Sequence, residues 1–487
     1  MSGASGERRG SAALNVWAPF VLLAAWGAFF AFIHDPSRHE LQAFLIARAS
    51  RGPLSLFHNL GHEGHPGLWH LVLLAAVRLY DDPLVVRLLQ AALAVASLAL
   101  IWLASPFAAV EKLLLSLSYY LAFEYVVLAP GYGLGVVLFF VFIALRRSTW
   151  AWLALGLMAN VGVHFMALAF VCGCLMLYRG QRSPLGIAVS AALAAVAALT
   201  VLPAADTIVA VQPGNGVTRA LLSLARLSGA LLPVNWTPPF NIAWSQACSE
   251  CGALAPLVLG ILVPAWGGLS LRRTPALAVA FLAACAALFL IGAAVYLGYD
   301  RHYGLAFVAL AGMHWIAREE VRAQAPRAAF RVWLVVSAAA GLWSSYLSLQ
   351  PDFAKGHATA RWLYDNREPG TVVAAYPAWM GIEASAYLGI AVYNLQAQRY
   401  NSFISWNYPG DVEPSSGDLS AWLKAAPKSG ALYLIADPAA LDHRIDDAMI
   451  RELGAGGVRL QEVVRFVAAS GSNVIYRVGF EAPSPAK

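Results

Sequence analysis

Charged residues are scarce in this chain, and their scarcity excludes a soluble enzyme. Only 12% of the 487 residues are charged, whereas 59% are hydrophobic and the mean hydropathy is +0.62. Such a composition is typical of a chain that buries apolar surface in lipid. We therefore predict a polytopic α-helical membrane protein. The net charge of +6 comes largely from arginines that flank apolar runs. This placement suits membrane lipids and gives no specific case for nucleic acid.

Cysteine is also rare, with five residues in the whole chain. Cys172, Cys174 and Cys285 fall within apolar runs, where thiols usually act as small hydrophobic side chains. Cys248 and Cys251 form a single CxxC, and a zinc site of this type needs a second pair. We expect a disulfide between them if their loop faces an oxidising compartment.

The first apolar run, at 14–33, lacks a small-residue cleavage pattern, so we expect an uncleaved span with the N-terminus in the cytoplasm. Further spans are predicted near 85–105, 112–127, 133–146, 150–162, 164–178, 184–203, 253–271, 275–298, 303–317 and 328–348. With about eleven spans, the loops that carry paired arginines all lie on the cytoplasmic side. This alternation of loops between the two sides of the membrane, which we call the parity, requires that the apolar helices at 66–80 and 221–233 do not cross the membrane.

Residues 350–487 have the composition of a soluble domain. Short β-rich runs occur at 371–376, 431–436, 458–464 and 473–478, and segments of helical character occur at 379–390 and 438–453. We predict a transmembrane domain over 1–349 and a soluble α/β domain over 350–487 on the extracytoplasmic side.

The loop at 35–84 concentrates ionisable residues at the mouth of an apolar span. Six of the chain's eleven histidines lie in or beside it, together with Asp35, Glu40, Glu63 and Arg38. The histidines are His34, His39, His58, His62, His65 and His70. Charged groups beside a bilayer are costly unless they are solvated or paired, so we predict a functional site here.

The predicted parity places a second set of polar residues on the same outer face: Glu124, Tyr132, His164, Arg301 and His302. Each has a structural alternative. His164 is also suited to packing, Glu124 to pairing between helices, and Arg301 to anchoring at the interface. Their shared face favours a common site.

Taken in order over roughly 14–350, these residues resemble the GT-C glycosyltransferases, in particular bacterial relatives of protein O-mannosyltransferases and of the lipid A aminoarabinose transferase. The resemblance is carried by His39-Glu40 and Arg48 after the first span, Glu63-Gly64-His65-Pro66 before an aromatic apolar helix, Glu124-Tyr125, Tyr132, His164 and Arg301-His302. It implies a GT-C-like fold in a bacterial inner membrane.

The resemblance also implies an inverting transfer of a sugar from a polyprenyl-phosphate-linked donor to an acceptor hydroxyl on the outer face. Such a reaction needs a carboxylate base for the hydroxyl and cations for the departing phosphate. We expect Glu40 to be the base, with His39 as a catalytic neighbour and Asp35 or Glu63 as substitutes. The expected substrate-binding residues are Arg38, His65, Glu124, Tyr132, His164, Arg301 and His302.

The expected partners are the lipid-linked donor, membrane lipids and an acceptor that is a lipid, a polysaccharide or a protein. We expect no cofactor. The alternative is a divalent cation bound at the lipid phosphate. Two positions depart from the family pattern. His39 stands where relatives have an acidic residue, and Pro130-Gly131 where relatives carry an arginine before the tyrosine.

Two other functions fit parts of the sequence. His58, His62 and His65 with Glu63 suggest a metal-dependent membrane hydrolase, although Gly61 and Gly64 argue against the helix that would align the imidazoles. A transporter or lipid flippase is the non-enzymatic alternative. In a transporter we would expect inverted repeats or charged residues in the middle of spans. In this sequence the charged residues gather at one face, and no repeat is apparent.

Overall fold

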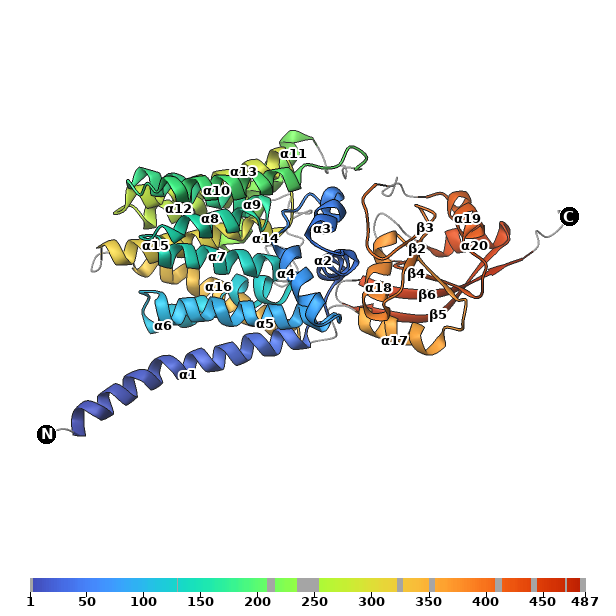
Figure 1. Ribbon diagram of the computed structural model, residues 1–487, viewed down its shortest axis with the longest axis horizontal. Helices are drawn as coiled ribbons and strands as arrows, with labels where there is room; N and C mark the ends of the chain where they lie inside the picture. Colours follow the sequence, from blue (N-terminus) through green and yellow to red (C-terminus); the bar gives the residue numbers. More distant parts are fainter. Residues whose placement is uncertain are drawn as a thin grey trace.

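The computed structural model describes residues 3–128, 130–207, 215–233, 254–321, 327–349, 355–407, 414–438, 445–468 and 471–481. The chain forms a bundle of helices with a smaller sheet-containing domain at one end (Figure 1). The Cys248–Cys251 pair lies outside the described residues.

Each predicted span coincides with helix. The bundle contains α1 (Gly3–Ile33), α5 (Leu84–Ala99) with η2 (Leu100–Ala104), α6 (Ala109–Ser116), η3 (Tyr119–Leu128), α7 (Pro130–Leu145), α8 (Trp150–Ala159), α9 (Val163–Tyr178), α10 (Pro184–Val201), α11 (Gly216–Leu231), α12 (Leu254–Ser270), α13 (Pro275–Ala294), α14 (Asp300–Tyr303), α15 (Leu305–Val321) and α16 (Arg327–Leu347). Helices suit these apolar runs because a helix satisfies its backbone polar groups internally.

Length and composition make four described helices candidates to cross a membrane alone: Leu84–Ala104, Pro184–Val201, Pro275–Ala294 and Ala328–Leu347. A fifth candidate combines Trp17–Ile33 with Arg38–Ala49, two helices bent by 81°. The chain is thus a largely helical membrane protein, and the number of about eleven crossings stays a prediction. The expected span at 112–127 is broken between α6 and η3, which is a π-helix.

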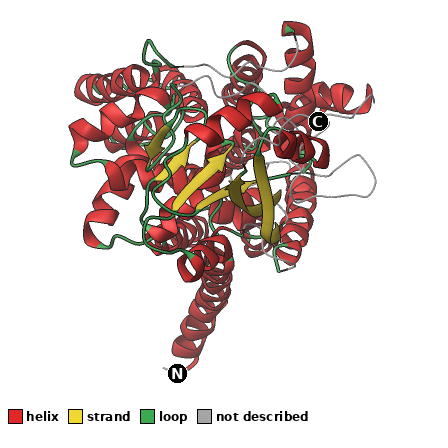
Figure 2. Cartoon of the chain, turned by 90° about the vertical axis from the view of Figure 1, so that its right-hand side faces the viewer, coloured by secondary structure: helices red, strands yellow, loops and turns green. Residues whose placement is uncertain are grey.

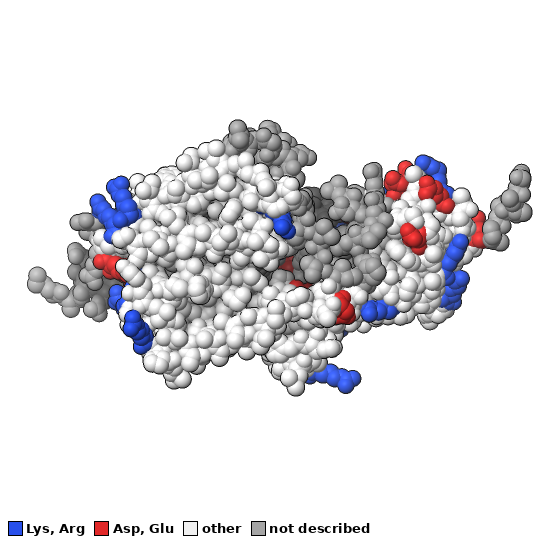
Figure 3. Space-filling model, turned by 90° about the horizontal axis from the view of Figure 1, so that it is seen from above, with Lys and Arg blue, Asp and Glu red and all other residues white. Residues whose placement is uncertain are grey.

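The end of the bundle far from the sheet domain carries a cluster of charges. Both oxygens of the buried Glu111 carboxylate accept hydrogen bonds from Arg318, at 2.9 and 3.0 Å, and Arg331 donates a third at 3.0 Å. Arg146 and Arg179 pair there with Glu319 and Glu320. Figure 3 shows lysine and arginine side chains at this end, separated from the sheet domain by a broad uncharged surface. This is the end that the sequence assigns to the cytoplasm.

The sheet domain has six strands in the order β3-β2-β1-β4-β6-β5. They are β1 (Val372–Tyr376), β2 (Val392–Asn394), β3 (Arg399–Asn401), β4 (Leu432–Ala436), β5 (Val458–Ala468) and β6 (Gly471–Phe480). Strand β1 pairs in parallel with β2 and β4, whereas the remaining pairs are antiparallel. The helices are α17 (Gly356–Asn366), η4 (Ala378–Gly381), α18 (Ile382–Leu388), α19 (Ser416–Ala425) and α20 (Asp447–Ala455), and they surround the sheet (Figure 2).

The predicted α/β character of this domain is confirmed, since all four β-rich runs form strands. The sequence missed β2 and β3, because three residues are too few to show a period. The helix expected from 438 begins at Asp447, since the Asp446 carboxylate caps it by accepting the Met449 amide at 2.9 Å; residues 439–444 lie outside the described chain.

The loop that follows α1 lies between the bundle and the sheet domain (Figure 1). It forms α2 (Arg38–Ala49), α3 (Pro53–Asn59), η1 (Leu60–His62) and α4 (Leu68–Leu79). Leu41 and Phe44 of α2 share one hydrophobic core with Ile382, Ala386 and Ile404 of the sheet domain. The loop is therefore built into the interface between the two parts.

Candidate functional site

Glu40 is buried at the start of α2, and both of its carboxylate oxygens have polar partners. One oxygen accepts from the Ser37 amide at 2.8 Å and hydroxyl at 2.9 Å, and it lies 3.0 Å from His34 Nε2. The other accepts from Gln90 Nε2 at 2.8 Å. Each carboxylate oxygen offers about two lone-pair sites, so one oxygen of Glu40 is fully engaged and the other keeps one site beside Gln90. The Glu40 side chain is 2% exposed. The carboxylate fixes the N-terminus of α2 against α5.

Asp35, the first substitute base, is engaged in a similar way. Its carboxylate accepts hydrogen bonds from the Tyr387 hydroxyl at 2.6 Å and Arg87 at 3.2 Å, and from the His357 amide at 3.3 Å. These contacts join the loop to α5 and to the sheet domain. Asp35 thus has the contacts of a structural residue that connects the loop to these two parts of the protein.

Glu63, the second substitute, is held by fewer partners and remains partly exposed. Its carboxylate accepts a hydrogen bond from Gln42 Nε2 at 2.7 Å and another from the Trp406 side chain. Burial raises the pKa of Glu63 to about 7, against the effect of these two donors. A carboxyl group with a pKa near the operating pH is suited to general base catalysis.

His39 and His65 both lie close enough to Arg301 for its charge to act on them, and we call the polar side chains gathered around these three residues the recess. Both imidazoles are exposed, yet the surrounding protein desolvates them and lowers their pKa, that of His39 to about 3. The charge of Arg301 lowers both values further. Both imidazoles are therefore neutral at pH 7 and available for hydrogen bonding in this recess.

Arg301 supplies the cation of the recess from α14. Its Nε lies 3.7 Å from Glu124 Oε1, beyond hydrogen-bond distance, and makes no hydrogen bond within the described residues. The side chain is 25% exposed. Glu124 is oriented by the Tyr119 hydroxyl at 2.9 Å, and the Tyr125 hydroxyl fixes the Arg301 carbonyl at 2.7 Å. The guanidinium is therefore held in place, with a buried Nε that makes no hydrogen bond and other atoms that are partly exposed.

An aromatic wall completes the recess beside Arg301. The rings of Tyr132 and Tyr125 stack at 5.5 Å, and Tyr132 meets His302 edge-on at 5.6 Å. The His164 and His302 rings are 4.5 Å apart. His302 Nδ1 lies 2.7 Å from the Tyr299 amide nitrogen and 2.9 Å from the Tyr299 carbonyl oxygen, so the Tyr299 backbone fixes the orientation of the ring.

Arg38, by contrast, turns toward the sheet domain. Its guanidinium lies 3.9 Å from the centre of the Trp379 ring and 3.2 Å from Met380 Sδ. The nearby Glu383 carboxylate partly offsets the burial that lowers the Arg38 pKa. Arg38 still lies close enough to His39 for its charge to lower the pKa of that imidazole. It therefore forms the domain-facing rim of the recess.

The structure thus brings together most of the residues expected to bind substrate. Arg301, Arg38 and His65 lie close enough to His39 to affect its pKa. Glu124 lies beside Arg301, Tyr132 and His164 contact His302, and the charge of Arg301 acts on His302. Sequence reasoning missed Gln42, Gln90 and Trp406, which hold the two loop glutamates. Uncharged amides and a tryptophan carry no signal that separates them from ordinary packing residues.

The histidine-rich loop does not form a metal centre within the described part of the chain. No three His, Cys, Asp or Glu side chains there are arranged to hold an ion. His62 instead contacts the Thr207 hydroxyl at 2.8 Å, and His58 is exposed at the end of α3. The alignment of His58, His62 and His65 that a hydrolase would use is absent from these described residues, because α3 ends at Asn59 and Gly64 turns the chain with φ +64°.

Neither a protein-family model nor a curated protein sequence matches this chain. Among solved structures, the chain is similar to a cryo-EM structure of a mutant of arabinofuranosyltransferase AftD from mycobacteria, at 14% sequence identity and a TM-score of 0.33. The match covers 94% of this chain and 41% of that chain. This chain therefore spans less than half the length of that protein, and a likeness this weak establishes neither fold nor activity.

Proposed function

We propose that this protein is a membrane glycosyltransferase. It takes a sugar from a polyprenyl-phosphate-linked donor and transfers it, with inversion, to an acceptor hydroxyl at the outer face of a bacterial inner membrane. The observation that carries this proposal is Arg301, a partly exposed guanidinium with an unbonded Nε–H, placed among neutral imidazoles and a tyrosine wall. Arg301 pairs with Glu124 at 3.7 Å without a hydrogen bond between them at Nε, and a guanidinium has several N–H donors that suit the oxygens of a lipid phosphate.

In the proposed reaction the acceptor oxygen attacks the anomeric carbon from the face opposite the phosphate. The new glycosidic C–O bond forms as the bond from carbon to phosphate oxygen breaks, and the electron pair leaves with the lipid phosphate. Arg301 stabilises the departing anion. Neutral His39, His65 and His302 add hydrogen bonds without opposing the positive charge that develops on the sugar.

The proton of the acceptor hydroxyl passes to a carboxylate. Glu40 was the first expectation from the sequence, with Glu63 as a substitute. We propose Glu63, because Glu40 is buried with four polar partners whereas Glu63 is partly exposed, has two partners and has a pKa near 7. On this proposal, Glu40 positions α2 and thereby His39. No step requires a cofactor, and metal analysis of the purified protein tests this part.

The membrane topology is part of the same proposal. The recess lies at the sheet-domain end of the bundle, and the arginine-rich end lies opposite (Figures 1 and 3). Applying the charge bias of membrane proteins, we assign the arginine-rich end to the cytoplasm and the sheet domain to the extracytoplasmic side. A donor whose tail stays in the bilayer then presents its phosphate at the depth of α14.

The direct test is to incubate the purified protein with a panel of polyprenyl-phosphate sugars and to measure release of polyprenyl phosphate. We expect release from at least one donor, with loss of release in Arg301→Ala. The matched control is Arg272→Ala, at the opposite end of the bundle between α12 and α13. Equal release by both variants, or no release from any donor, would refute the proposal.

A further inference from the structure

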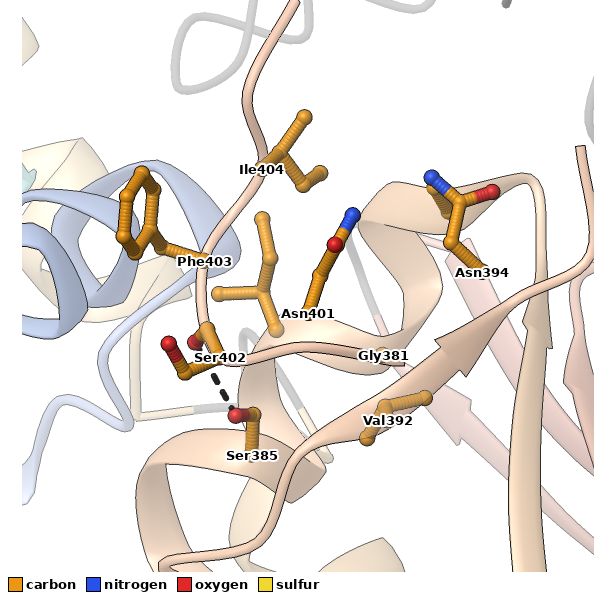
Figure 4. A pocket seen from close by; sticks show the side chains of 10 residues that line it. Gly381, Ser385, Val392, Asn394, Asn401, Ser402, Phe403 and Ile404 are labelled. Atoms are coloured by element: carbon orange, nitrogen blue, oxygen red, sulfur yellow. Dashed lines mark hydrogen bonds between the residues drawn. The ribbon is translucent and has the colours of Figure 1, made fainter. Parts of the chain in front are cut away.

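A small cavity in the sheet domain contains polar groups without partners. It is lined by Ala378, Gly381, Ile382, Ser385, Val392, Asn394, Asn401, Ser402, Phe403 and Ile404 and has a volume of about 20 Å³. We call it the asparagine pocket. Figure 4 shows the amide nitrogens of Asn394 and Asn401 on the same side of the pocket. Neither nitrogen makes a hydrogen bond within the described residues.

The orientation of Asn394 is fixed by its own turn. Its Oδ1 accepts the amides of Gln396 at 3.0 Å and Ala397 at 3.1 Å, so Nδ2 is the end left over. The side chain is 3% exposed. A buried donor without a partner costs about 1–3 kcal/mol, and such groups are rare in folded proteins. The arrangement therefore indicates a group that occupies the pocket and accepts from Asn394.

Strand register explains why the second amide lies beside the first. Val392 of β2 pairs with Asn401 of β3, and Asn394 pairs with Arg399. Residues two apart on a strand, and residues directly opposite across a pair, share one face of the sheet. The two asparagines thus present their amides on one face, while Phe403 and Ile404 close the opposite wall. Arg399 shares this face but bonds to the Asn407 side chain and does not line the pocket.

The chemistry of this pocket selects a neutral ligand. All ten lining residues are uncharged, so the pocket offers no charge to compensate an anion or a cation. Two amide donors among apolar side chains and one aromatic ring suit the hydroxyl oxygens of a sugar. A volume of about 20 Å³ admits one water-sized group, such as a single hydroxyl substituent, and the rest of the sugar would lie across the rim.

Gln42 connects the asparagine pocket to Glu63. Gln42 Nε2 donates to the Ile404 carbonyl at 2.8 Å, and Gln42 Oε1 accepts the Ile404 amide at 3.0 Å. The same Nε2 donates to Glu63 at 2.7 Å. Two residues beyond Ile404, Trp406 bonds to Glu63 as well. A sugar seated in the pocket is therefore only one side chain away from the carboxylate proposed as base.

We propose that the asparagine pocket is a subsite for a neutral sugar unit of the acceptor, so that the acceptor is a glycan rather than a protein side chain or a simple lipid. This rests on the proposed glycosyl transfer. The pocket would hold one unit of the glycan while the next unit presents its hydroxyl beside Glu63.

The test measures binding and catalysis separately in the full-length protein. A panel of neutral disaccharides, with uronic-acid disaccharides in parallel, is titrated by saturation-transfer NMR. Asn394→Asp keeps the oxygen that the turn needs and replaces the donor with a second carboxyl oxygen, which also adds a charge. Asn401→Ala removes the second donor by a different change. The matched control is Asn366→Asp, an exposed residue of α17 whose side chain bonds within its own helix.

We expect the wild type to bind at least one neutral disaccharide, with affinity about tenfold weaker in Asn394→Asp and in Asn401→Ala and unchanged in the control. No binding by the wild type, binding of uronic-acid disaccharides alone, or full affinity in both variants would overturn the subsite. Release of polyprenyl phosphate is measured in parallel, with the disaccharides or water as the acceptor. Release without disaccharide binding refutes only the subsite, whereas disaccharide binding without release supports a sugar site and refutes the transfer.

Discussion

Glu63→Gln provides the sharpest test of the proposed chemistry, because activity and stability should change in opposite directions. The variant keeps the size of the side chain and an oxygen that can accept from Gln42, but it cannot take a proton. General base catalysis typically contributes 10² to 10⁴-fold, so turnover should fall by about 10²-fold or more. Donor affinity should persist, since Arg301 is untouched.

The wild-type pH profile has a defined midpoint. With a pKa of about 7, Glu63 is mostly protonated at pH 6 and mostly ionised at pH 8, so turnover should rise roughly tenfold between these values. Initial rates of donor consumption in a series of buffers of constant ionic strength measure this rise. Glu63→Gln should lose it.

The stability of the folded protein should change with pH in the direction opposite to turnover. The folded-state pKa of Glu63 lies above its ordinary value of 4.5, so folding favours the neutral carboxyl. The contribution of the neutral Glu63 carboxyl to the free energy of unfolding is fully present below about pH 4.5. It is lost as the pH rises through about 7, a change of about 3 kcal/mol. At pH 8, Glu63→Gln should therefore unfold at a higher temperature than the wild type. Normal turnover with an unchanged pH profile would refute the assignment, and loss of turnover in Glu40→Gln without loss of stability would transfer the role to Glu40.

Four further changes test other parts of the structure. Glu40→Gln turns an amide toward four donor groups and should lower stability by about 2–3 kcal/mol in thermal unfolding, whereas unchanged unfolding would show that its partners are dispensable. Arg301→Lys keeps the charge but loses the planar fork, so affinity for polyprenyl phosphate should fall about tenfold at constant stability; equal affinity would leave Arg301 as an anchor. Glu111→Gln removes the partner of two buried or half-buried arginines and should cost about 3–5 kcal/mol without changing donor affinity in the folded fraction; a neutral effect would mean that solvent screens this cluster. Gly64 has φ +64° with open space around its Cβ position, so Gly64→Ala should cost about 1–2 kcal/mol and reduce turnover by displacing His65, and full turnover would show that this turn tolerates adjustment.

Much of the architecture was predictable because its signals are local. Long apolar runs specify helices, and the β-rich runs at 371–376 and 431–436 specify the central strands β1 and β4. The loop histidines and Arg301 were recognisable because ionisable side chains beside a membrane are costly unless they are solvated or paired, so they mark candidate functional sites. Their meeting in one recess followed from topology, which placed their segments on one face.

The environment of each carboxylate was not predictable, because it depends on distant uncharged partners. Glu40 is bonded by Gln90, 50 residues away, and Glu63 by Gln42 and Trp406. Nothing in the local sequence separates a carboxylate with four partners from one with two. The ranking of the two candidate bases therefore required the fold, and the span count and domain boundary at 349 and 350 stay predictions.

The contact between Gln42 and Ile404 has a consequence for how the protein is made. The two residues lie 362 positions apart, and ribosomes add about 5–20 residues per second, so α2 is synthesised roughly 20–70 s before its partner. Throughout that interval Leu41 and Phe44 lack the apolar neighbours that bury them in the finished protein. The recess can mature only after the last domain has emerged, so a prematurely terminated chain should insert in the membrane but remain inert and exposed to proteases and chaperones.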